Sequence, residues 1–155
     1  MLYLVVKTLH ILSALLFLGA GLMTAYYKVR ADRSGKLEVL TWYQREIVLA
    51  DWIFTLPTVV IQPVTGIMLM SVTGFPFDST WFLAVSGLYV IVTACWIPVV
   101  FIQVRLRDVT KPLRDGDALP PEYHRLFRRW VTLGFPAGIS MAVIFALMVF
   151  KPWLA

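Results

Sequence analysis

The sequence contains very few of the residues on which most soluble enzymes and metal sites depend. It has one cysteine, Cys95, and two histidines, and only 15% of its 155 residues are charged. A single cysteine excludes an internal disulfide, a CxxC redox motif, a thiolate zinc site and a cysteine-bound iron–sulfur cluster. There is also no HExxH motif, no GxSxG elbow and no phosphate-binding glycine loop. The sequence therefore has no signature of a zinc protease, a serine hydrolase or a P-loop nucleotidase.

Apolar residues, by contrast, are abundant. They make up 59% of the chain, and its mean hydropathy is +0.77. A soluble domain of this length cannot bury so much apolar surface, so lipid must be its main solvent. Four apolar runs, at residues 3–27, 47–72, 80–104 and 130–150, are each near or above the roughly 20 residues needed to cross the hydrocarbon core. We therefore predict a single integral membrane domain over residues 1–155, folded as an all-α four-helix transmembrane bundle with antiparallel neighbours.

The basic residues are concentrated in two of the three connections between these runs. The connection at 73–79 has no lysine or arginine, whereas the other two are rich in both. By the positive-inside rule both basic connections are cytoplasmic, so both termini lie outside, on the periplasmic side of a bacterial inner membrane. The net charge of +5 then reflects which connections face the cytoplasm, and we expect membrane lipid, not nucleic acid, as the partner. The basic residues in question are Lys28, Arg30, Arg33, Lys36 and Arg45 in the first connection, and Arg105, Arg107, Lys111, Arg114, Arg125, Arg128 and Arg129 in the other.

Polar residues inside the second run recur with the period of a helix. Successive steps of four, three, four, three and one residues place them on one face. Two interpretations remain open, because such a stripe either bonds one helix to another or lines a ligand or ion site. Prolines within the runs leave backbone carbonyls free for polar neighbours, and Gly134 and Gly138 form a small-xxx-small pair typical of close helix packing. The stripe consists of Asp51, Thr55, Thr58, Gln62, Thr65 and Gly66.

The first run carries Lys7 and His10, which are three residues apart and share a helix face in the outer leaflet. Lys7 lies close enough to the membrane edge to extend its ammonium into water. His10 either bonds another helix or acts as a metal or haem ligand or a proton-transfer group. Its depth corresponds to Gln62 and Thr65 in the second run and to Tyr89 in the third.

Both ends of the chain resemble a known family. The segment Tyr3–Ile11, with its Lys-x-x-His pattern, is similar to the start of the first helix in HemJ-type membrane proteins, the bacterial protoporphyrinogen oxidases, and in copper-resistance CopD-type proteins. Phe135-Pro136-Ala137 and Phe150-Lys151-Pro152-Trp153 resemble the last helix and tail of the HemJ family. Tyr26-Tyr27-Lys28 and Phe101-Ile102-Gln103 stand where that family typically has further histidines. The chain looks closest to an uncharacterised group of predicted bacterial integral membrane proteins related to HemJ.

The resemblance implies a haem- or porphyrin-associated membrane redox protein with haem b as cofactor. His10 would ligate the iron, and Lys7 and Lys151 would pair with propionates. Gln62, Thr65 and Tyr89 would then form the polar shell around the ligand. Because no other run contains a histidine, two histidines can ligate one haem only across a homodimer.

Two other functions remain open from the sequence. One is a small cation or proton carrier that uses the stripe of Asp51, Thr55 and Thr58. The other is a structural or assembly subunit of a membrane complex. We expect a homodimer or a larger membrane complex.

Overall fold

The computed structural model describes residues 1–114 and 116–150, and its regular elements there are all helices. Four stretches are long and apolar enough to cross a membrane: Leu2–Arg33, Leu37–Thr73, Thr80–Thr110 and Pro121–Val149. The all-α transmembrane bundle predicted from the sequence is therefore confirmed. The elements are α1 (Leu2–Arg33), α2 (Leu37–Ala50), the π-helical turn η1 (Asp51–Thr55), α3 (Leu56–Thr73), α4 (Thr80–Thr110) and α5 (Pro121–Val149).

The helices extend further than the apolar runs. The first ends at Arg33 instead of residue 27, the second begins at Leu37 instead of 47, the third ends at Thr110 instead of 104, and the fourth begins at Pro121 instead of 130. Hydropathy detects only the part of a helix that lies in hydrocarbon, and lysine, arginine, glutamate and glutamine continue a helix well beyond it. Most residues that we assigned to basic loops therefore lie on helices.

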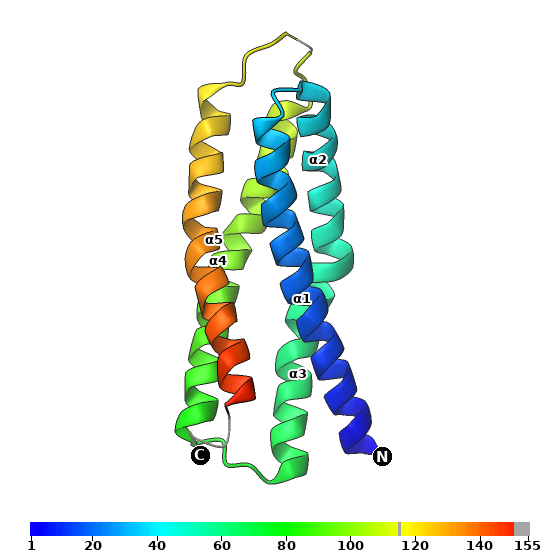
Figure 1. Cartoon of the computed structure of the whole chain (residues 1–155), viewed down its shortest axis with the longest axis vertical. Coiled ribbons are helices and arrows are strands. Elements are labelled where there is room, and N and C mark those ends of the chain that lie inside the picture. The colour runs from blue at the N-terminus through cyan, green and yellow to red at the C-terminus, as the bar shows by residue number, and fades with distance from the viewer. Residues whose placement is uncertain (115, 151–155) are drawn as a thin grey trace.

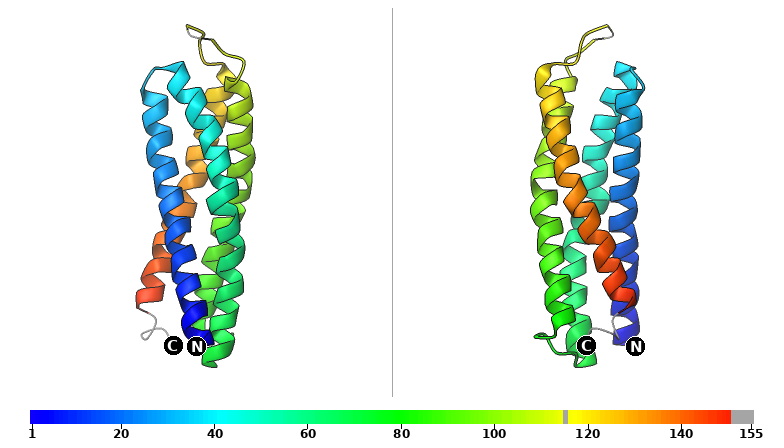
Figure 2. Two further views of the ribbon diagram at one scale, coloured as in Figure 1. Left: turned by 90° about the vertical axis from the view of Figure 1, so that its right-hand side faces the viewer. Right: turned by 60° about the vertical axis from the view of Figure 1, so that its left-hand side comes forward.

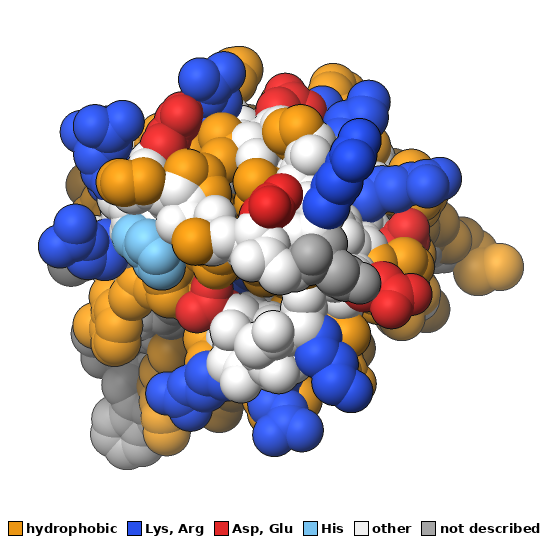
Figure 3. Space-filling model, turned by 90° about the horizontal axis from the view of Figure 1, so that it is seen from above, with side chains coloured by type: hydrophobic (Ala, Val, Ile, Leu, Met, Phe, Trp, Pro, Cys, Tyr) orange, Lys and Arg blue, Asp and Glu red, His pale blue; other side chains and the backbone are white. Residues whose placement is uncertain are grey.

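The spans alternate in direction, and neighbours pack along their length. α1 packs along α3 and α2, and α4 packs along α5 and α2. The connection 34–36 and the segments 111–114 and 116–120 share one end of the bundle, while the connection 74–79 and the N-terminus lie at the other (Figures 1 and 2). We call these the basic end and the N-terminal end. Seen from the basic end, lysine and arginine side chains surround the rim of the molecule (Figure 3).

The distribution of side chains is that of a membrane protein. Large apolar residues cover the outside, where lipid solvates them, whereas many of the buried side chains are polar. Two apolar clusters accompany these polar groups, one centred on Leu106 and Tyr123 near the basic end and one on Phe17 and Val92 further in. The buried polar residues are Ser13, Lys28, Gln44, Asp51, Thr55, Thr58, Thr65, Gln103, Thr110 and Ser140.

Two prolines shape the second span. Pro57 has no N–H for the carbonyl of Ile53 and would clash with it, and the helix widens just before this proline, so that the Leu56 N–H bonds to Asp51 O in a π-type turn. Pro63 likewise leaves the carbonyl of Val59 free, and the hydroxyl of Tyr89 on α4 donates to it at 2.5 Å. At Val59 the expectation that polar neighbours satisfy such carbonyls is confirmed.

Gly134 and Gly138, the small-xxx-small pair typical of close helix packing, do not pack against another helix within the described residues. Both are exposed on α5, and a Cβ added at either would meet nothing within 4 Å among the described residues. α5 packs against α4 through other faces, since its buried residues are Tyr123, Trp130 and Ser140 together with Ile144. The glycine pair therefore lies on an outer face of the bundle.

Candidate functional site

His10 lies between α1 and α3 and joins them. Its Nδ1 is 2.8 Å from the Thr65 hydroxyl, and its backbone carbonyl accepts a hydrogen bond from the Gln62 amide, also at 2.8 Å. The structure thus brings together His10, Gln62 and Thr65, three of the four residues to which the sequence assigned similar depths. The imidazole is half-buried.

Hydrogen bonding around Thr65 determines which imidazole nitrogen carries the proton. The Thr65 hydroxyl has one hydrogen, and its carbonyl acceptor, Ile61 O, is only 2.6 Å away. The Thr65 oxygen therefore accepts from His10, whose proton is on Nδ1. The lone pair then resides on Nε2, the nitrogen that would accept a proton or bind a metal.

The Gln62 amide strengthens the same junction. Besides bonding His10 O it donates to the hydroxyl of Ser13 at 2.5 Å, and Ser13 in turn donates to His10 O at 3.1 Å. A Cβ added at Gly66 would lie 3.5 Å from His10 Cε1, an ordinary van der Waals distance, so the ring lies next to this glycine. The junction is consequently a compact set of interhelical bonds.

Other residues assigned to a porphyrin site are not gathered here. The Lys7 side chain is exposed, with its ammonium 5.5 Å from the centre of the Tyr3 ring. Tyr89 directs its hydroxyl to Val59 O instead of to the imidazole. Lys151 lies outside the described residues. Of the proposed shell, only Gln62 and Thr65 contact His10.

The stripe on the second span faces the interior, as its period predicted. Asp51, Thr55 and Thr58 are buried. The Thr58 hydroxyl donates to its own helix, at 3.0 Å to Phe54 O and 2.8 Å to Thr55 O. Asp51 lies beside Thr55, and its Oδ2 has no hydrogen-bond partner in the described part of the chain. A buried carboxylate with one free oxygen therefore lies on the π-helical turn.

A group centred on Lys28, which sequence reasoning placed in a loop, is buried near the basic end. The Lys28 ammonium donates to the Tyr123 hydroxyl at 2.9 Å, and that hydroxyl donates to Asp32 Oδ1 at 2.6 Å. The ammonium also lies 5.0 Å and 5.2 Å from the ring centres of Tyr123 and Phe127. Steps of three and four residues from buried Phe17 lead to Lys28, so helical periodicity continued past the apolar run would have identified it.

Two buried glutamines, Gln44 on α2 and Gln103 on α4, lie in the half of the bundle toward the basic end. Neither amide atom of Gln44 has a hydrogen-bond partner among residues 1–114 and 116–150, and neither does Gln103 Oε1. Gln44 lies beside the Tyr123 hydroxyl and is seven residues before Asp51, on the same helix face. Polar groups therefore occur along the interior from the basic end toward the N-terminal end. We call the following set the polar line: Asp32, Tyr123, Lys28, Gln44, Gln103, Asp51, Thr55, Thr58, Gln62, Ser13, Thr65 and His10.

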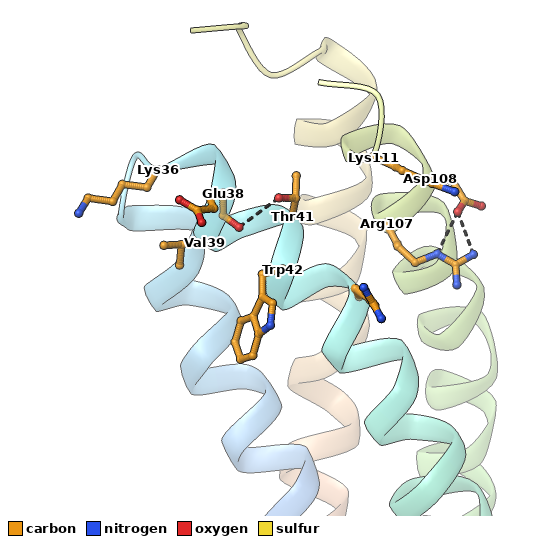
Figure 4. Close-up of a pocket in the computed structure, with 9 residues that line it drawn as sticks. Lys36, Glu38, Val39, Thr41, Trp42, Arg107, Asp108 and Lys111 are labelled. Carbon is orange, nitrogen blue, oxygen red and sulfur yellow. Dashed lines mark hydrogen bonds and ion pairs between the residues drawn. The ribbon is translucent and has the colours of Figure 1, made fainter. Parts of the chain in front are cut away.

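The described residues contain no cluster of three or more histidine, cysteine, aspartate or glutamate side chains that would hold a metal ion by themselves. One groove of about 1130 Å³ lies between α2 and α4 at the basic end (Figure 4). A second, of about 400 Å³ and largely apolar, lies between α1 and the second span and includes Tyr43, whose hydroxyl donates to Thr24 O at 2.6 Å. Neither groove is lined by His10.

Comparison with known protein families identifies a family for this chain. The model of a family described as "Predicted integral membrane protein (DUF2269)" matches residues 4–152. No curated protein and no solved structure matches the chain.

Proposed function

We propose that this chain, which belongs to the DUF2269 family of predicted integral membrane proteins, carries protons across the bilayer along the polar line. The observation that carries the proposal is Asp51. Its carboxylate is buried within a membrane span, and one oxygen has no partner among the described residues. Ionisable groups inside membranes are costly and typically belong to ion or proton pathways.

Groups able to relay a proton lie on both sides of Asp51. Toward the basic end are Gln44, Gln103 and the Lys28 group. Toward the N-terminal end, the buried threonine oxygens of the stripe lead to Gln62 and to the Nε2 lone pair of His10. Water molecules would bridge members of the line that are too far apart for a direct bond.

A proton is the cargo that suits a chain of this size. A hydrated metal ion needs a pore lined by several ligands, and no cluster suited to hold one occurs in the described part of the bundle. A proton needs only successive donors and acceptors. Four helices of one chain supply these without an oligomeric pore.

Proton flux into liposomes tests the proposal. The purified chain is reconstituted with an enclosed pH-sensitive dye, and a potassium diffusion potential drives protons inward. We expect Asp51→Asn to lower the flux roughly tenfold, because the amide cannot accept a proton. Asp78→Asn, in the exposed 74–79 connection, removes the same charge outside the line and should leave the flux unchanged.

Two results would refute the proposal. One is a wild-type flux no greater than that of empty liposomes. The other is an Asp51→Asn flux equal to that of the wild type when both proteins insert to the same extent.

A haem- or porphyrin-associated redox function of the HemJ type is a second candidate, supported by the lone pair on His10 Nε2. Thr65 orients the imidazole through Nδ1, an arrangement typical of histidines that ligate metals. His10 fits a single axial ligand to haem b, which when bound would supply the electron transfer. Because Lys7 is exposed and Tyr89 is bonded elsewhere, the chain's contribution would be to hold the imidazole.

An absorption spectrum before and after dithionite reduction tests this candidate. A Soret band that His10→Ala abolishes would support it, whereas a colourless protein that takes up no added haemin would contradict it. If that colourless protein still carries protons, proton transport along the polar line would be the function. A structural or assembly role would instead give neither flux nor colour but a defined copurifying partner, for which Gly134 and Gly138 offer an open helix face.

We also propose that the basic end faces the cytoplasm in a bacterial inner membrane, with both termini in the periplasm. The concentration of lysine and arginine around that end supports this orientation (Figure 3). Alkaline phosphatase fused to the C-terminus should be active, and green fluorescent protein fused there should be dark. A fluorescent fusion would reverse the assignment.

A further inference from the structure

The groove at the basic end is built from the start of α2 and the end of α4. Its volume is about 1130 Å³. Figure 4 shows Lys36, Glu38 and Trp42 at and near the start of α2, and Arg107, Asp108 and Lys111 at the end of α4. The lining residues are Lys36, Glu38, Val39, Thr41, Trp42, Arg45, Arg107, Asp108 and Lys111.

The groove has an excess of positive charge. Four of its lining side chains are cationic and two are anionic. Asp108 is already engaged by Arg107, which donates to it through Nε at 3.0 Å and Nη2 at 2.8 Å. Lys36, Arg45 and Lys111 form no ion pair within the described residues. Three unpaired cations are therefore available to an anion.

The groove also has an apolar side. Trp42 is 62% exposed and Val39 is 39% exposed, and Trp42 lies further from the basic end than Lys36 (Figure 4). Exposed tryptophan is typical of the level where headgroups meet acyl chains. Lys36 and Lys111 therefore lie at the helix ends that border the groove, Trp42 lies further along α2, and Arg45 follows three residues beyond it. A soluble anion would use only the charged part of this surface.

We propose that this groove binds the phosphate-bearing headgroup of an anionic phospholipid. Lys36, Arg45 and Lys111 attract the negatively charged headgroup, while Trp42 and Val39 lie beside the acyl chains. Lysine and arginine near a membrane surface attract anionic lipid in this way. A bound lipid spans α2 and α4, so its binding also stabilises the packing of the second span, which bears the polar line, against the third.

Lipid binding by the full chain in neutral detergent is measured by native mass spectrometry with phosphatidylglycerol. The triple variant Lys36→Gln, Arg45→Gln, Lys111→Gln should bind roughly tenfold or more weakly, given the attraction of each cation at a membrane surface. The matched control is Arg125→Gln, Arg128→Gln, Arg129→Gln. It removes the same charge from exposed positions on α5, outside the groove, and should change binding less than about twofold.

Two further arms establish the source of the phosphate. Phosphatidylcholine with the same acyl chains should bind at least about tenfold more weakly than phosphatidylglycerol, because its headgroup has no net charge. Inorganic phosphate at equal concentration should not displace phosphatidylglycerol, since it does not use the apolar side of the groove.

Three outcomes would overturn the proposal. Equal losses in the two triple variants would show diffuse attraction by the whole basic end. Undiminished lipid binding by the groove variant would show that the groove is not the binding site. Displacement by inorganic phosphate at equal concentration would assign the groove to a soluble phosphate compound. Should the groove variant lose helical circular dichroism, the single substitution Lys111→Gln tests the same contact and should weaken binding about threefold.

Discussion

Removing the single oxygen of Tyr123 should destabilise this protein more than removing the whole charge of Lys28. Both side chains are fully buried, and the Tyr123 hydroxyl accepts from Lys28 and donates to Asp32. Tyr123→Phe leaves a buried ammonium without its acceptor and a carboxylate without its donor. Breaking one partner of a buried charged network costs about 3–5 kcal/mol.

Lys28→Met has a smaller expected cost because it removes the ion itself. It loses one hydrogen bond to a charged group, worth about 1.5–3 kcal/mol, and the attraction of two aromatic rings. The variant avoids the cost of desolvating a buried ammonium, because methionine is apolar, and the Tyr123 hydroxyl still donates to Asp32. We therefore expect a net loss of about 1–2 kcal/mol.

The double variant distinguishes this reasoning from simple loss of contacts. With Lys28→Met already present, Tyr123→Phe no longer leaves an ammonium unpaired, so the double variant should be more stable than Tyr123→Phe alone. The free energy of unfolding is measured by titration with sodium dodecyl sulfate in mixed micelles. Additive losses, or a Tyr123→Phe protein as stable as Lys28→Met, would refute the assigned network.

Two other predictions concern hydrogen bonds within the membrane. Thr65→Val removes the hydroxyl bonded to the imidazole and should cost about 1–2 kcal/mol. Thr58→Val, whose hydroxyl bonds only its own helix, should cost less than about 0.5 kcal/mol. Equal losses in the same unfolding titration would contradict a stabilising bond between His10 and Thr65. Tyr89→Phe should cost about 1–2 kcal/mol because it leaves the Val59 carbonyl, which Pro63 cannot pair with, without a donor. This cost should be smaller in a Pro63→Ala background, because alanine restores the backbone N–H that can bond Val59 O. An equal cost in that background would contradict a role of the Tyr89 hydroxyl in pairing this carbonyl.

The number of spans and the inward direction of the stripe follow from the sequence for simple physical reasons. Hydrocarbon thickness sets the length of an apolar run, and the helical period places Asp51, Thr55 and Thr58 on one side. Depth counted from the membrane edge also put His10 level with Gln62 and Thr65, which it contacts. These inferences need only one helix at a time.

Contacts between helix ends were beyond the sequence. Hydropathy identifies only the part of a helix that lies in hydrocarbon, so Lys28 and Tyr123 were assigned to loops. Both lie on helices that continue beyond the apolar runs, and they bond in the interior. The rotation of each helix about its axis likewise decides that Tyr89 reaches Val59 O and not His10, and that Gly134 faces outward.

The sequence by itself therefore determined a four-span membrane protein with a polar face on its second span. Only the tertiary structure decided how far that polar face extends and what it meets. It joins the His10 junction at one end and, through Gln44 and Gln103, approaches the Lys28 group at the other. The physical reason is that periodicity fixes which side of a helix is polar, whereas packing between helices fixes which polar groups become partners.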